Sequence, residues 1–462
     1  MAPRARIVPL IVGLPLFLQN LDTSVMATAL PTIASSLQVD PLDLNLAITS
    51  YLLSLAIFLP VSGWFAERFG ARRVFCYAIA FFSVGSALCG MASSLPGLVF
   101  FRIIQGLGGA MMLPVGRLIL LRSVPASGMV AAMVWFTVPP TIARMLGPLF
   151  GGAVVTWISW HWIFLVNVPF GLLAIVLALR YIDAQPTPAA QPEPFDGGGF
   201  LLLAVALVGL LGAMETASNA LVPGWVSVAA AAFGLFALGA YVLRSRGMAS
   251  PLVDLSVLRY RTYRASVIGG FPLRIAIGAS PFLMPLMLQL GFGMSPLASG
   301  LLTVATAIGS LATRPVMSLV IRRLGFRTLL ICTTTLASCF YAGYGLFRPD
   351  TPHVLMFFTL VLGGLVNSMG LVALASLGFA EVPEQRMSHA ATLGSMAQQV
   401  SISMGVVLGA ALVGAAARWH GRDAAHLAAN DFPPAFVFVG VMTLISLFSF
   451  VRLRREDGAS LR

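Results

Sequence analysis

The stretch MVAAMVWFTVPPTIARMLGPLFGGAVVTW (129–157) contains a single charged residue, Arg144. An α-helix needs about twenty apolar residues to cross a bilayer, so this stretch is long enough to span one. A charge near the centre of such a helix costs about 2.5–3.5 kcal/mol on insertion scales. The stretch therefore predicts a membrane-spanning helix and raises the question of what Arg144 contributes in return.

The whole chain has the composition of an integral membrane protein. Its 462 residues are 58% hydrophobic and only 10% charged, whereas an average soluble chain is about 25% charged. All 28 basic residues are arginine. Because a P-loop and a retinal Schiff base each require a lysine, nucleotide-driven pumps of the Walker type and light-driven retinal pumps are excluded.

Fourteen apolar runs are each long enough to cross a bilayer, which predicts an all-α membrane protein with fourteen transmembrane helices. The runs lie near residues 8–33, 44–65, 74–93, 97–121, 129–156, 161–182, 198–217, 222–243, 265–290, 296–321, 327–347, 353–378, 389–417 and 432–453. No segment between them is long enough for a soluble catalytic domain, and no nucleophile–base pair stands out. We therefore expect no enzymatic activity.

The placement of arginine predicts the orientation of the chain. With both termini inside, the cytoplasmic segments hold twenty arginines and the outer loops hold three, Arg348, Arg418 and Arg422. The remaining five lie within predicted spans: Arg102, Arg117, Arg144, Arg274 and Arg314. The net charge of +12 is then explained by basic loops that face an anionic cytoplasmic leaflet, without a nucleic-acid partner.

A short pattern occurs twice in the chain, once in the N-terminal part and once in the C-terminal part. ERFGARRV (67–74) follows the second run and RRLGFRTL (322–329) follows the tenth; both contain Arg, an apolar residue, Gly, any residue and Arg. This placement predicts two six-helix halves with a site near the midplane, as in secondary transporters. The predicted divisions are an N-terminal half (1–182), a Pro-rich cytoplasmic linker (183–197), two additional helices (198–243), a basic cytoplasmic connection (244–264) and a C-terminal half with a short cytoplasmic tail (265–462).

Several motifs in the first 171 residues resemble signatures of one transporter family. LDTSVMATALP (21–31) resembles the first-span signature of drug:proton antiporters, and GWFAERFGARRV (63–74) resembles a loop 2–3 motif. RIIQGLGGAMMLP (102–114) resembles a fourth-span motif, and GPLFGG with WHWIFLVNVPFG (160–171) resembles a fifth-to-sixth-span signature. The chain thus resembles the major facilitator superfamily, in its fourteen-span drug:proton antiporter (EmrB/QacA-like) branch, and is similar there to MdtD-type proteins.

This resemblance implies a major facilitator fold and proton-coupled, multidrug-type efflux of small organic molecules across a bacterial inner membrane. It implies no cofactor and no metal site, because the proton gradient supplies the energy. The expected partners are the lipid bilayer, a small-molecule substrate and protons. Two alternatives stay open: an exporter of organic anions or metal–anion chelates, and a non-transporting membrane receptor or channel.

Asp22 is the clearest acid within a predicted span. It lies about 22 Å along the first helix at 1.5 Å per residue, and Arg102 lies at a similar depth in the fourth. Intramembrane carboxylates usually mark ion pathways or pair with a base. We expect Asp22 to carry the coupling proton and Arg102 to tune its exchange; the alternative is a static salt bridge.

The loop and fifth-span motifs are expected to serve conformational switching. Glycines at 63 and 70 would allow close helix approach and a tight turn, and Glu67, where the family usually has Asp, would latch the opposite half. The alternatives are a plain basic loop and simple helix packing. The predicted switching residues are Gly63, Glu67, Arg68, Gly70, Arg72, Gly147, Pro148, Gly151 and Gly152.

Arg144 departs from the family pattern, which commonly has Gly and Pro before GPxxGG. It lies about 24 Å along its helix, near the depth of Asp22. A guanidinium in a wet cavity suits a carboxylate or phosphate, which favours anionic or chelating substrates with Arg144 and Arg274 as contacts. Alternatively, Arg144 pairs with Asp22 or with helix carbonyls.

Four further side chains are candidates for an apolar part of the substrate pocket, unless they contact lipid or the protein core. They are Met111, Met112, Phe271 and Phe282.

Overall fold

The computed structural model describes residues 3–124, 129–183, 195–218, 223–248, 251–422, 426–454 and 456–458. The regular elements in these ranges are all helices. The proline-rich part of the predicted linker, residues 184–194, lies outside the described residues. The α-helices are α1 (Pro3–Leu37), α2 (Asn45–Phe58), α3 (Ser62–Phe69), α4 (Ala71–Cys89), α5 (Leu95–Ser123), α6 (Met129–Trp157), α7 (Trp162–Leu165), α8 (Asn167–Tyr181), α9 (Gly197–Ser218), α10 (Gly224–Arg246), α11 (Arg261–Arg264), α12 (Phe271–Leu286), α13 (Pro296–Tyr344), α14 (His353–Gly378), α15 (Met387–Trp419), α16 (Pro433–Thr443) and α17 (Leu447–Phe450).

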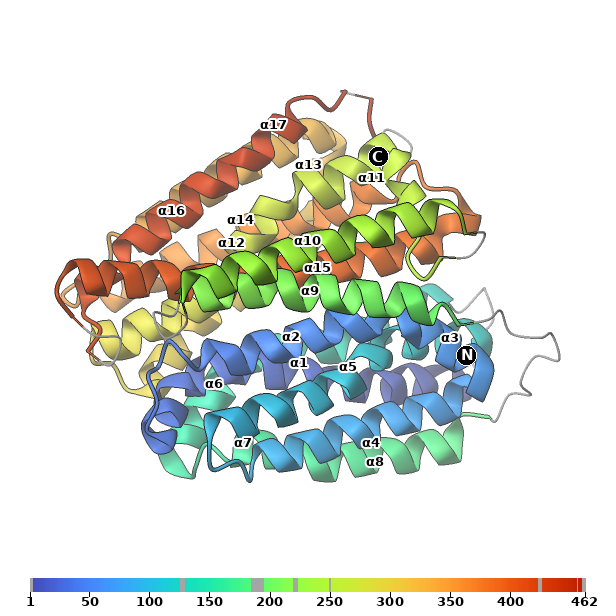
Figure 1. Cartoon of the computed structure of the whole chain (residues 1–462), viewed down its shortest axis with the longest axis horizontal. Helices are drawn as coiled ribbons and strands as arrows, with labels where there is room; N and C mark the ends of the chain where they lie inside the picture. Colours follow the sequence, from blue (N-terminus) through green and yellow to red (C-terminus); the bar gives the residue numbers. More distant parts are fainter. Residues whose placement is uncertain are drawn as a thin grey trace.

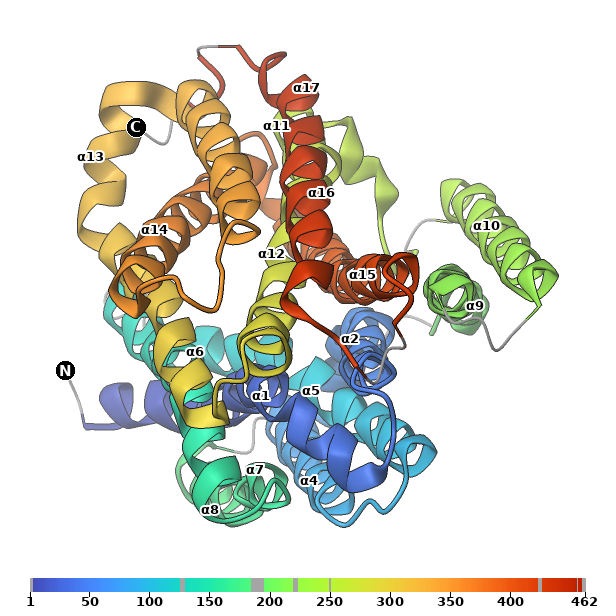
Figure 2. The same ribbon diagram turned by 90° about the vertical axis from the view of Figure 1, so that its left-hand side faces the viewer.

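Thirteen helical segments of the described chain are long and apolar enough to cross a membrane, whereas the sequence predicts fourteen. The difference lies in α13, whose 49 residues would extend about 74 Å as one straight helix, more than twice the thickness of a bilayer core. Gly325 interrupts α13 with φ 72° and ψ 163°, and the chain changes direction there (Figure 2). This one segment therefore contains the predicted tenth and eleventh spans.

The repeated sequence pattern has a similar backbone conformation in both places. Gly70 ends α3 with φ 88° and ψ 131°, and Gly325 has φ 72° and ψ 163°. Glycine adopts positive φ at little steric cost, whereas a residue with a Cβ does not. The glycine of each pattern thus allows the chain to end one membrane-spanning helix and begin the next within a single residue.

The helices form two layers, with a helical hairpin beside them (Figures 1 and 2). One layer consists of α1 to α8 and the other of α11 to α17; we refer to them as the N-terminal half and the C-terminal half. The hairpin consists of α9 and α10, which pack on each other, and α9 also contacts α2 and α15. The two layers meet along their inner faces, where a functional site between halves would lie.

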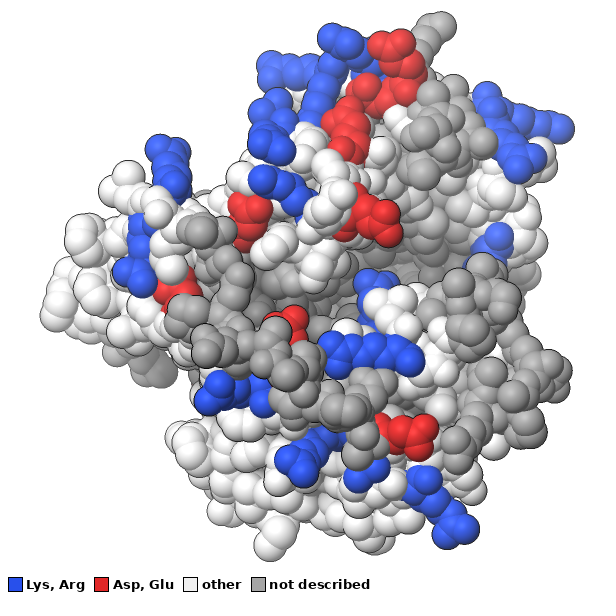
Figure 3. Space-filling view, turned by 90° about the vertical axis from the view of Figure 1, so that its right-hand side faces the viewer, with Lys and Arg blue, Asp and Glu red and all other residues white. Residues whose placement is uncertain are grey.

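Arginines gather at one end of the layers, which we call the arginine-rich face (Figure 3). The described chain begins and ends on this side (Figure 1). The other end of the layers, which carries Arg348, Arg418 and Arg422, is the opposite face. The arginine-rich face includes Arg68, Arg72, Arg73, Arg180, Arg244, Arg246, Arg322, Arg323 and Arg386.

Gly325→Ala should destabilise the protein by about 1–3 kcal/mol, because a Cβ is strongly disfavoured in this region of backbone conformation. Thermal unfolding of the purified protein measures the loss as a lower Tm. Gly343→Ala in the same helix is the matched control: a Cβ there meets no atom within 4 Å, so the Tm should stay unchanged or rise slightly. Equal Tm values for the two variants would contradict the assigned role of Gly325.

Candidate functional site

Asp22 of α1 and Arg102 of α5 form a buried ion pair. Arg102 Nη1 donates to Asp22 Oδ2 over 2.5 Å, and both side chains are 1% exposed. The structure thus brings together the two residues that the sequence places at similar depth. Removing one partner of a buried pair leaves an uncompensated charge and typically costs about 3–5 kcal/mol.

Gln105 closes this pair into a three-residue network. Its Nε2 donates to Asp22 Oδ1 over 2.9 Å, and its Oε1 accepts from Arg102 Nη1 over 2.8 Å. Each carboxylate oxygen of Asp22 therefore has its own donor. Gln105 was not predicted as a site residue, although it lies one helical turn after Arg102, a spacing at which side chains on one helix meet.

Two aromatic rings enclose the guanidinium of Arg102. Its central carbon lies 4.9 Å from the ring centroid of Tyr51 on α2 and 5.2 Å from that of Phe164 on α7. Cation–π attraction stabilises a desolvated cation by about 2 kcal/mol. Phe164 belongs to the WHWIFLVNVPFG motif, so this motif contributes a wall of the site. The Asp22 cluster comprises Asp22, Arg102, Gln105, Tyr51 and Phe164.

Close to the opposite face, the backbones of α6 and α13 touch. A Cβ on Gly152 would lie 2.6 Å from the carbonyl oxygen of Pro296, and a Cβ on Gly300 would lie 2.3 Å from that of Pro148. No side chain fits at either glycine without separating the helices. The GPLFGG motif of α6 therefore joins the N-terminal half to the C-terminal half.

The other two glycines of the motif pack within the N-terminal half. A Cβ on Gly147 would lie 2.4 Å from the Ser24 side chain, and a Cβ on Gly151 would lie 2.9 Å from Val25. Because Ser24 and Val25 follow Asp22 on α1, the motif also fixes α6 against the helix that carries the acid.

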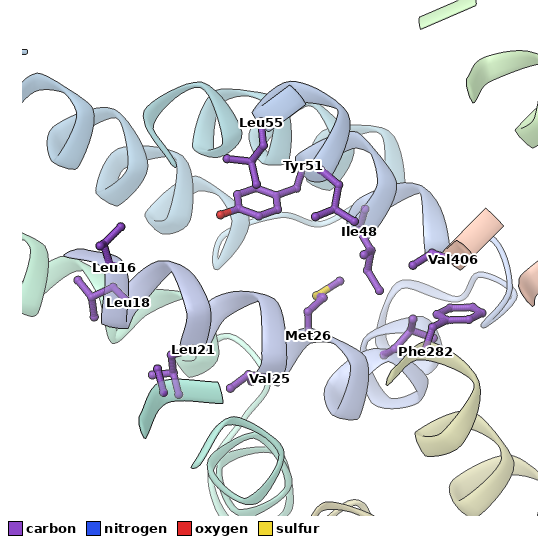
Figure 4. Close-up of a cluster of buried hydrophobic side chains, with 14 of the residues drawn as sticks. Leu16, Leu18, Leu21, Val25, Met26, Ile48, Tyr51, Leu55, Phe282 and Val406 are labelled. Carbon is purple, nitrogen blue, oxygen red and sulfur yellow. The ribbon is translucent and has the colours of Figure 1, made fainter. Parts of the chain in front are cut away.

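Buried apolar side chains from both halves extend this contact into a seal (Figure 4). The seal is formed by Met26, Ile48, Phe282 and Val406. Beside it, Gln289 Nε2 donates to the carbonyl oxygen of Thr28 over 2.9 Å. The halves are thus held together near the opposite face by apolar contact and by a hydrogen bond between them.

At the arginine-rich face the surface is hollowed between the halves (Figure 3). A cavity of about 950 Å³ opens there, with walls from α3, α10, α15 and the segment before α11. Its charged lining residues are Glu67, Asp196, Arg246, Asp254 and Arg386. Contact near one face combined with an opening at the other is the geometry of a transporter that is accessible from one side.

The loop motif lies at the mouth of this cavity. Gly63 and Glu67 line the cavity, and Arg68 is exposed. No atom of the described residues lies within 4 Å of a Cβ on Gly63, so among these residues the close helix approach expected there is not present in this conformation. Arg72 Nη1 donates over 3.0 Å to the carbonyl oxygen of Ile182, just beyond α8, and so ties α4 to α8 within one half.

Across the mouth from Glu67, Arg386 is held by the segment that precedes α11. It pairs with Asp254 over 3.3 Å and donates to Ser256 Oγ. Partial burial alone would raise the pKa of Asp254, but hydrogen bonds from Ser256 and the charge of Arg386 hold it below its ordinary value. Asp254 is therefore ionised at neutral pH, and Arg386 has a charged partner on its own side of the mouth.

Arg274 lies apart from Arg144. It is 6% exposed, and its Nη1 donates over 2.8 Å to the carbonyl oxygen of Ser266. Ser266 lies in a π-helical turn, Ala265–Gly269, that precedes α12. In this conformation the Arg274 guanidinium therefore binds a backbone carbonyl rather than facing an open space.

The Arg144 side chain is exposed at the protein surface, and its guanidinium has no hydrogen-bond or ion-pair partner in the described chain. The expected alternative of a pair with Asp22 is absent, because both Asp22 oxygens are bound elsewhere. The charge of Arg314 on α13 acts on Arg144, and Arg314 Nη2 donates over 2.7 Å to Oγ1 of Thr141, one turn before Arg144. The structure thus places Arg314, not Arg274, beside Arg144.

Most of the side chains predicted to line an apolar substrate pocket are buried inside the protein. Met111, Met112 and Phe282 are buried, and Phe271 is half-buried. The cavity at the arginine-rich face is lined by none of the four. Their role in substrate binding stays a prediction for another conformation of the protein.

The fold and this geometry agree with comparisons to known proteins. A sequence profile of the Major Facilitator Superfamily matches residues 13–401 and 266–461. The chain belongs to the Major Facilitator Superfamily. The predicted family and fold are therefore confirmed, and the protein is a multi-pass membrane transporter, not an enzyme.

The relatives that carry the name "Putative multidrug resistance protein MdtD" include proteins from Klebsiella pneumoniae and Salmonella heidelberg. The one from Klebsiella pneumoniae (strain 342) is 36% identical over 467 residues, which covers 97% of each chain. The one from Salmonella heidelberg (strain SL476) is 36% identical over 413 residues, covering 89% of this chain and 87% of the relative. Among solved structures, a POT family transporter in complex with 5-aminolevulinic acid has a TM-score of 0.71 at 16% identity, covering 99% of this chain and 96% of that one.

Gly300→Val should shift the protein away from the observed conformation, because the valine side chain cannot fit against the Pro148 carbonyl. Spin labels at the exposed positions Trp157 and Leu346 measure the separation of the halves at the opposite face, which should increase. Gly239→Val, where a Cβ meets no atom within 4 Å, is the matched control. An unchanged distance distribution in folded Gly300→Val would show that the glycine contact does not hold the halves together.

Proposed function

We propose that this protein is a proton-coupled exporter of small organic molecules, an antiporter of the multidrug type. The names of its relatives support efflux of drug-like compounds. The excess of arginine supports a cytoplasmic location for the arginine-rich face and for both termini, in a bacterial inner membrane. The observed conformation is then inward-facing, with access from the cytoplasm.

The Asp22 cluster carries the proposal of proton coupling. The hydrogen bonds that Arg102 and Gln105 donate to the two carboxylate oxygens favour the ionised form of Asp22. In an antiport cycle, the inward-facing protein has released its proton and is ready to take up substrate. An intact ion pair in an inward-facing conformation fits this step.

Protonation of Asp22 would remove the charge that balances Arg102. The guanidinium would keep its hydrogen bond to Gln105 and its contacts with the rings of Tyr51 and Phe164. These groups allow Arg102 to stay charged and in place while its carboxylate partner exchanges a proton. The cluster therefore has two stable protonation states, which coupling requires.

Helix α1 connects this cluster to the seal between the halves. Met26 lies one turn beyond Asp22, and the carbonyl of Thr28 accepts the hydrogen bond from Gln289 of the C-terminal half. A shift of α1 against α5 during proton exchange at Asp22 would reach both contacts. We infer that, once the protein faces outward and has released its substrate, proton uptake by Asp22 re-forms the seal and favours the return to the inward-facing conformation.

Closure of the arginine-rich face would bring the two walls of its cavity together. Glu67 lies on the N-terminal wall, and Arg386 and His389 lie on the C-terminal wall. Arg386 would then exchange Asp254 for Glu67 as its partner. In this proposal Glu67 latches the outward-facing state, and in the observed state it forms no ion pair with a basic residue of the described chain.

Asp22→Asn should abolish transport driven by a pH gradient in proteoliposomes, because asparagine cannot carry the coupling proton. Counterflow exchange without a gradient, with a ligand selected by thermal stabilisation over a drug and metabolite panel, should persist. Asp22→Glu should retain partial activity with a shifted pH optimum. The double variant Asp22→Asn/Arg102→Gln leaves no unpaired buried charge, and it separates loss of coupling from loss of folding.

Uphill export by Asp22→Asn at the wild-type rate would disprove the role of Asp22. Absence of any proton-dependent flux in the wild-type protein would instead favour a receptor or channel.

Arg72→Ala should slow turnover with little change in ligand affinity, because it removes the tie between α4 and α8 at the arginine-rich face. Arg72→Lys retains a donor for the Ile182 carbonyl and should preserve most of the turnover. Binding and counterflow measured on the same preparations separate affinity from rate. A large loss of affinity with normal turnover would place Arg72 in ligand binding rather than in switching.

A further inference from the structure

Arg144 and Arg314 form a pair of positive charges contributed by opposite halves. Arg144 lies about 22 Å from the start of α6, and Arg314 lies about 27 Å from the start of α13, so both are inside the membrane-spanning region. Both side chains are exposed, although the helices that carry them pack on each other. Their charges repel, so the arrangement is unfavourable unless something compensates for it.

The position of Arg314 is fixed by a chain of hydrogen bonds. Its Nη2 donates over 2.7 Å to Thr141 Oγ1, and that hydroxyl donates over 2.8 Å to the carbonyl oxygen of Thr137. The guanidinium therefore reaches from α13 to α6, the helix that carries Arg144. Ser24 Oγ of α1 donates over 3.3 Å to the backbone carbonyl of Arg144 and fixes this turn of α6 as well.

Within the described chain, no carboxylate forms an ion pair with either arginine. Asp22, an acid at similar depth, is buried and enclosed with Arg102 and Gln105. The buried Arg274 has a backbone carbonyl as its acceptor. Arg144 and Arg314 thus differ from Arg102 and Arg274: their side chains are exposed, and no acid of the described chain compensates their charge.

We propose that Arg144 and Arg314 bind an oxyanion, a carboxylate or phosphate group of the exported molecule, between the two halves. This inference rests on the proposed function and adds the substrate class to it. Guanidinium groups bind carboxylate and phosphate through paired, charge-assisted hydrogen bonds. The substrates are then amphiphilic anions, because a lipophilic cation would meet two positive charges at the same place.

Because the two arginines lie on opposite halves, binding of an anion between them would also affect the relative position of the halves. An anion between Arg144 and Arg314 replaces their repulsion by attraction to a shared ligand. Because one arginine belongs to each half, this attraction holds α6 and α13 together at the depth of the pair. The ligand therefore favours a conformation in which these two helices lie close to each other.

The test uses two probes with the same apolar body and opposite charge, 2-naphthylacetate and 2-(2-naphthyl)ethylamine. Their binding to the full-length protein is measured by calorimetry in phosphatidylcholine nanodiscs at neutral pH without a gradient. The acetate should bind more tightly than the amine. Arg144→Gln and Arg314→Gln should each weaken acetate binding by about tenfold to a hundredfold, and the two lysine variants by less.

Arg180→Gln is the matched control, because Arg180 is an exposed arginine in the last turn of α8, outside the pair. It should bind the acetate like the wild-type protein. Size-exclusion profiles and Tm values establish that each variant is folded. If Gln variants fail to fold, the lysine variants still give a measurable loss of affinity.

A second arm distinguishes a soluble anion from a lipid headgroup. Part of the phosphatidylcholine is replaced by phosphatidylglycerol, and acetate binding is measured again. Unchanged binding supports a soluble anion as the ligand. Competition by phosphatidylglycerol that disappears in Arg144→Gln and Arg314→Gln supports the same oxyanion site with a lipid phosphate as its occupant.

The proposal is overturned if the amine binds as tightly as the acetate, if the acetate does not bind, or if both Gln variants bind it like the wild-type protein. Because these measurements involve no proton gradient, they do not depend on coupling. A protein that binds the acetate through both arginines but shows no proton-driven flux would refute the proposed function and leave this binding site in place.

Discussion

The buried ion pair between Asp22 and Arg102 is the interaction on which the rest of this transporter depends. It lies in the N-terminal half, where both oxygens of the acid and the faces of the guanidinium are satisfied by α1, α2, α5 and α7. Such a pair contributes little net stability compared with apolar packing, because both charges must be desolvated. Its retention is understandable if the protein needs a proton-binding acid in the membrane, with a cation that holds its ionised form.

The contacts between the halves differ in kind at the two faces. Near the opposite face, backbone touches backbone at Gly152 and Gly300, and apolar side chains fill the remaining space. At the arginine-rich face, charged side chains line an open cavity. Apolar seals close without specific partners, whereas charged walls close only when each group finds an opposite charge. Closure of the opposite face therefore depends on apolar packing, whereas closure of the arginine-rich face depends on the formation of ion pairs.

The sequence predicts the fold well because hydrophobic length is a local property. The tenth and eleventh spans are separate apolar runs in the sequence, and in the structure the non-helical backbone of Gly325 separates them within α13. The meeting of Asp22 and Arg102 followed from depth along two helices. Gln105, Tyr51 and Arg314 were not predicted as partners, because rotation about the helix axes and contact between halves decide which side chains meet. For Arg274, a single π-helical turn redirected the guanidinium to a carbonyl, and no pattern in the apolar run indicates that turn.

The hairpin of α9 and α10 adds a constraint that a twelve-helix arrangement would lack. Helix α9 touches α2 in the N-terminal half and α15 in the C-terminal half, so it bridges the line along which the halves separate. Any rocking of the halves must shear at least one of these contacts. The hairpin therefore contacts both halves while they move relative to each other. The cost of sliding these helix contacts past one another contributes to the energy barrier of the cycle, and the two contacts limit how far the halves can separate.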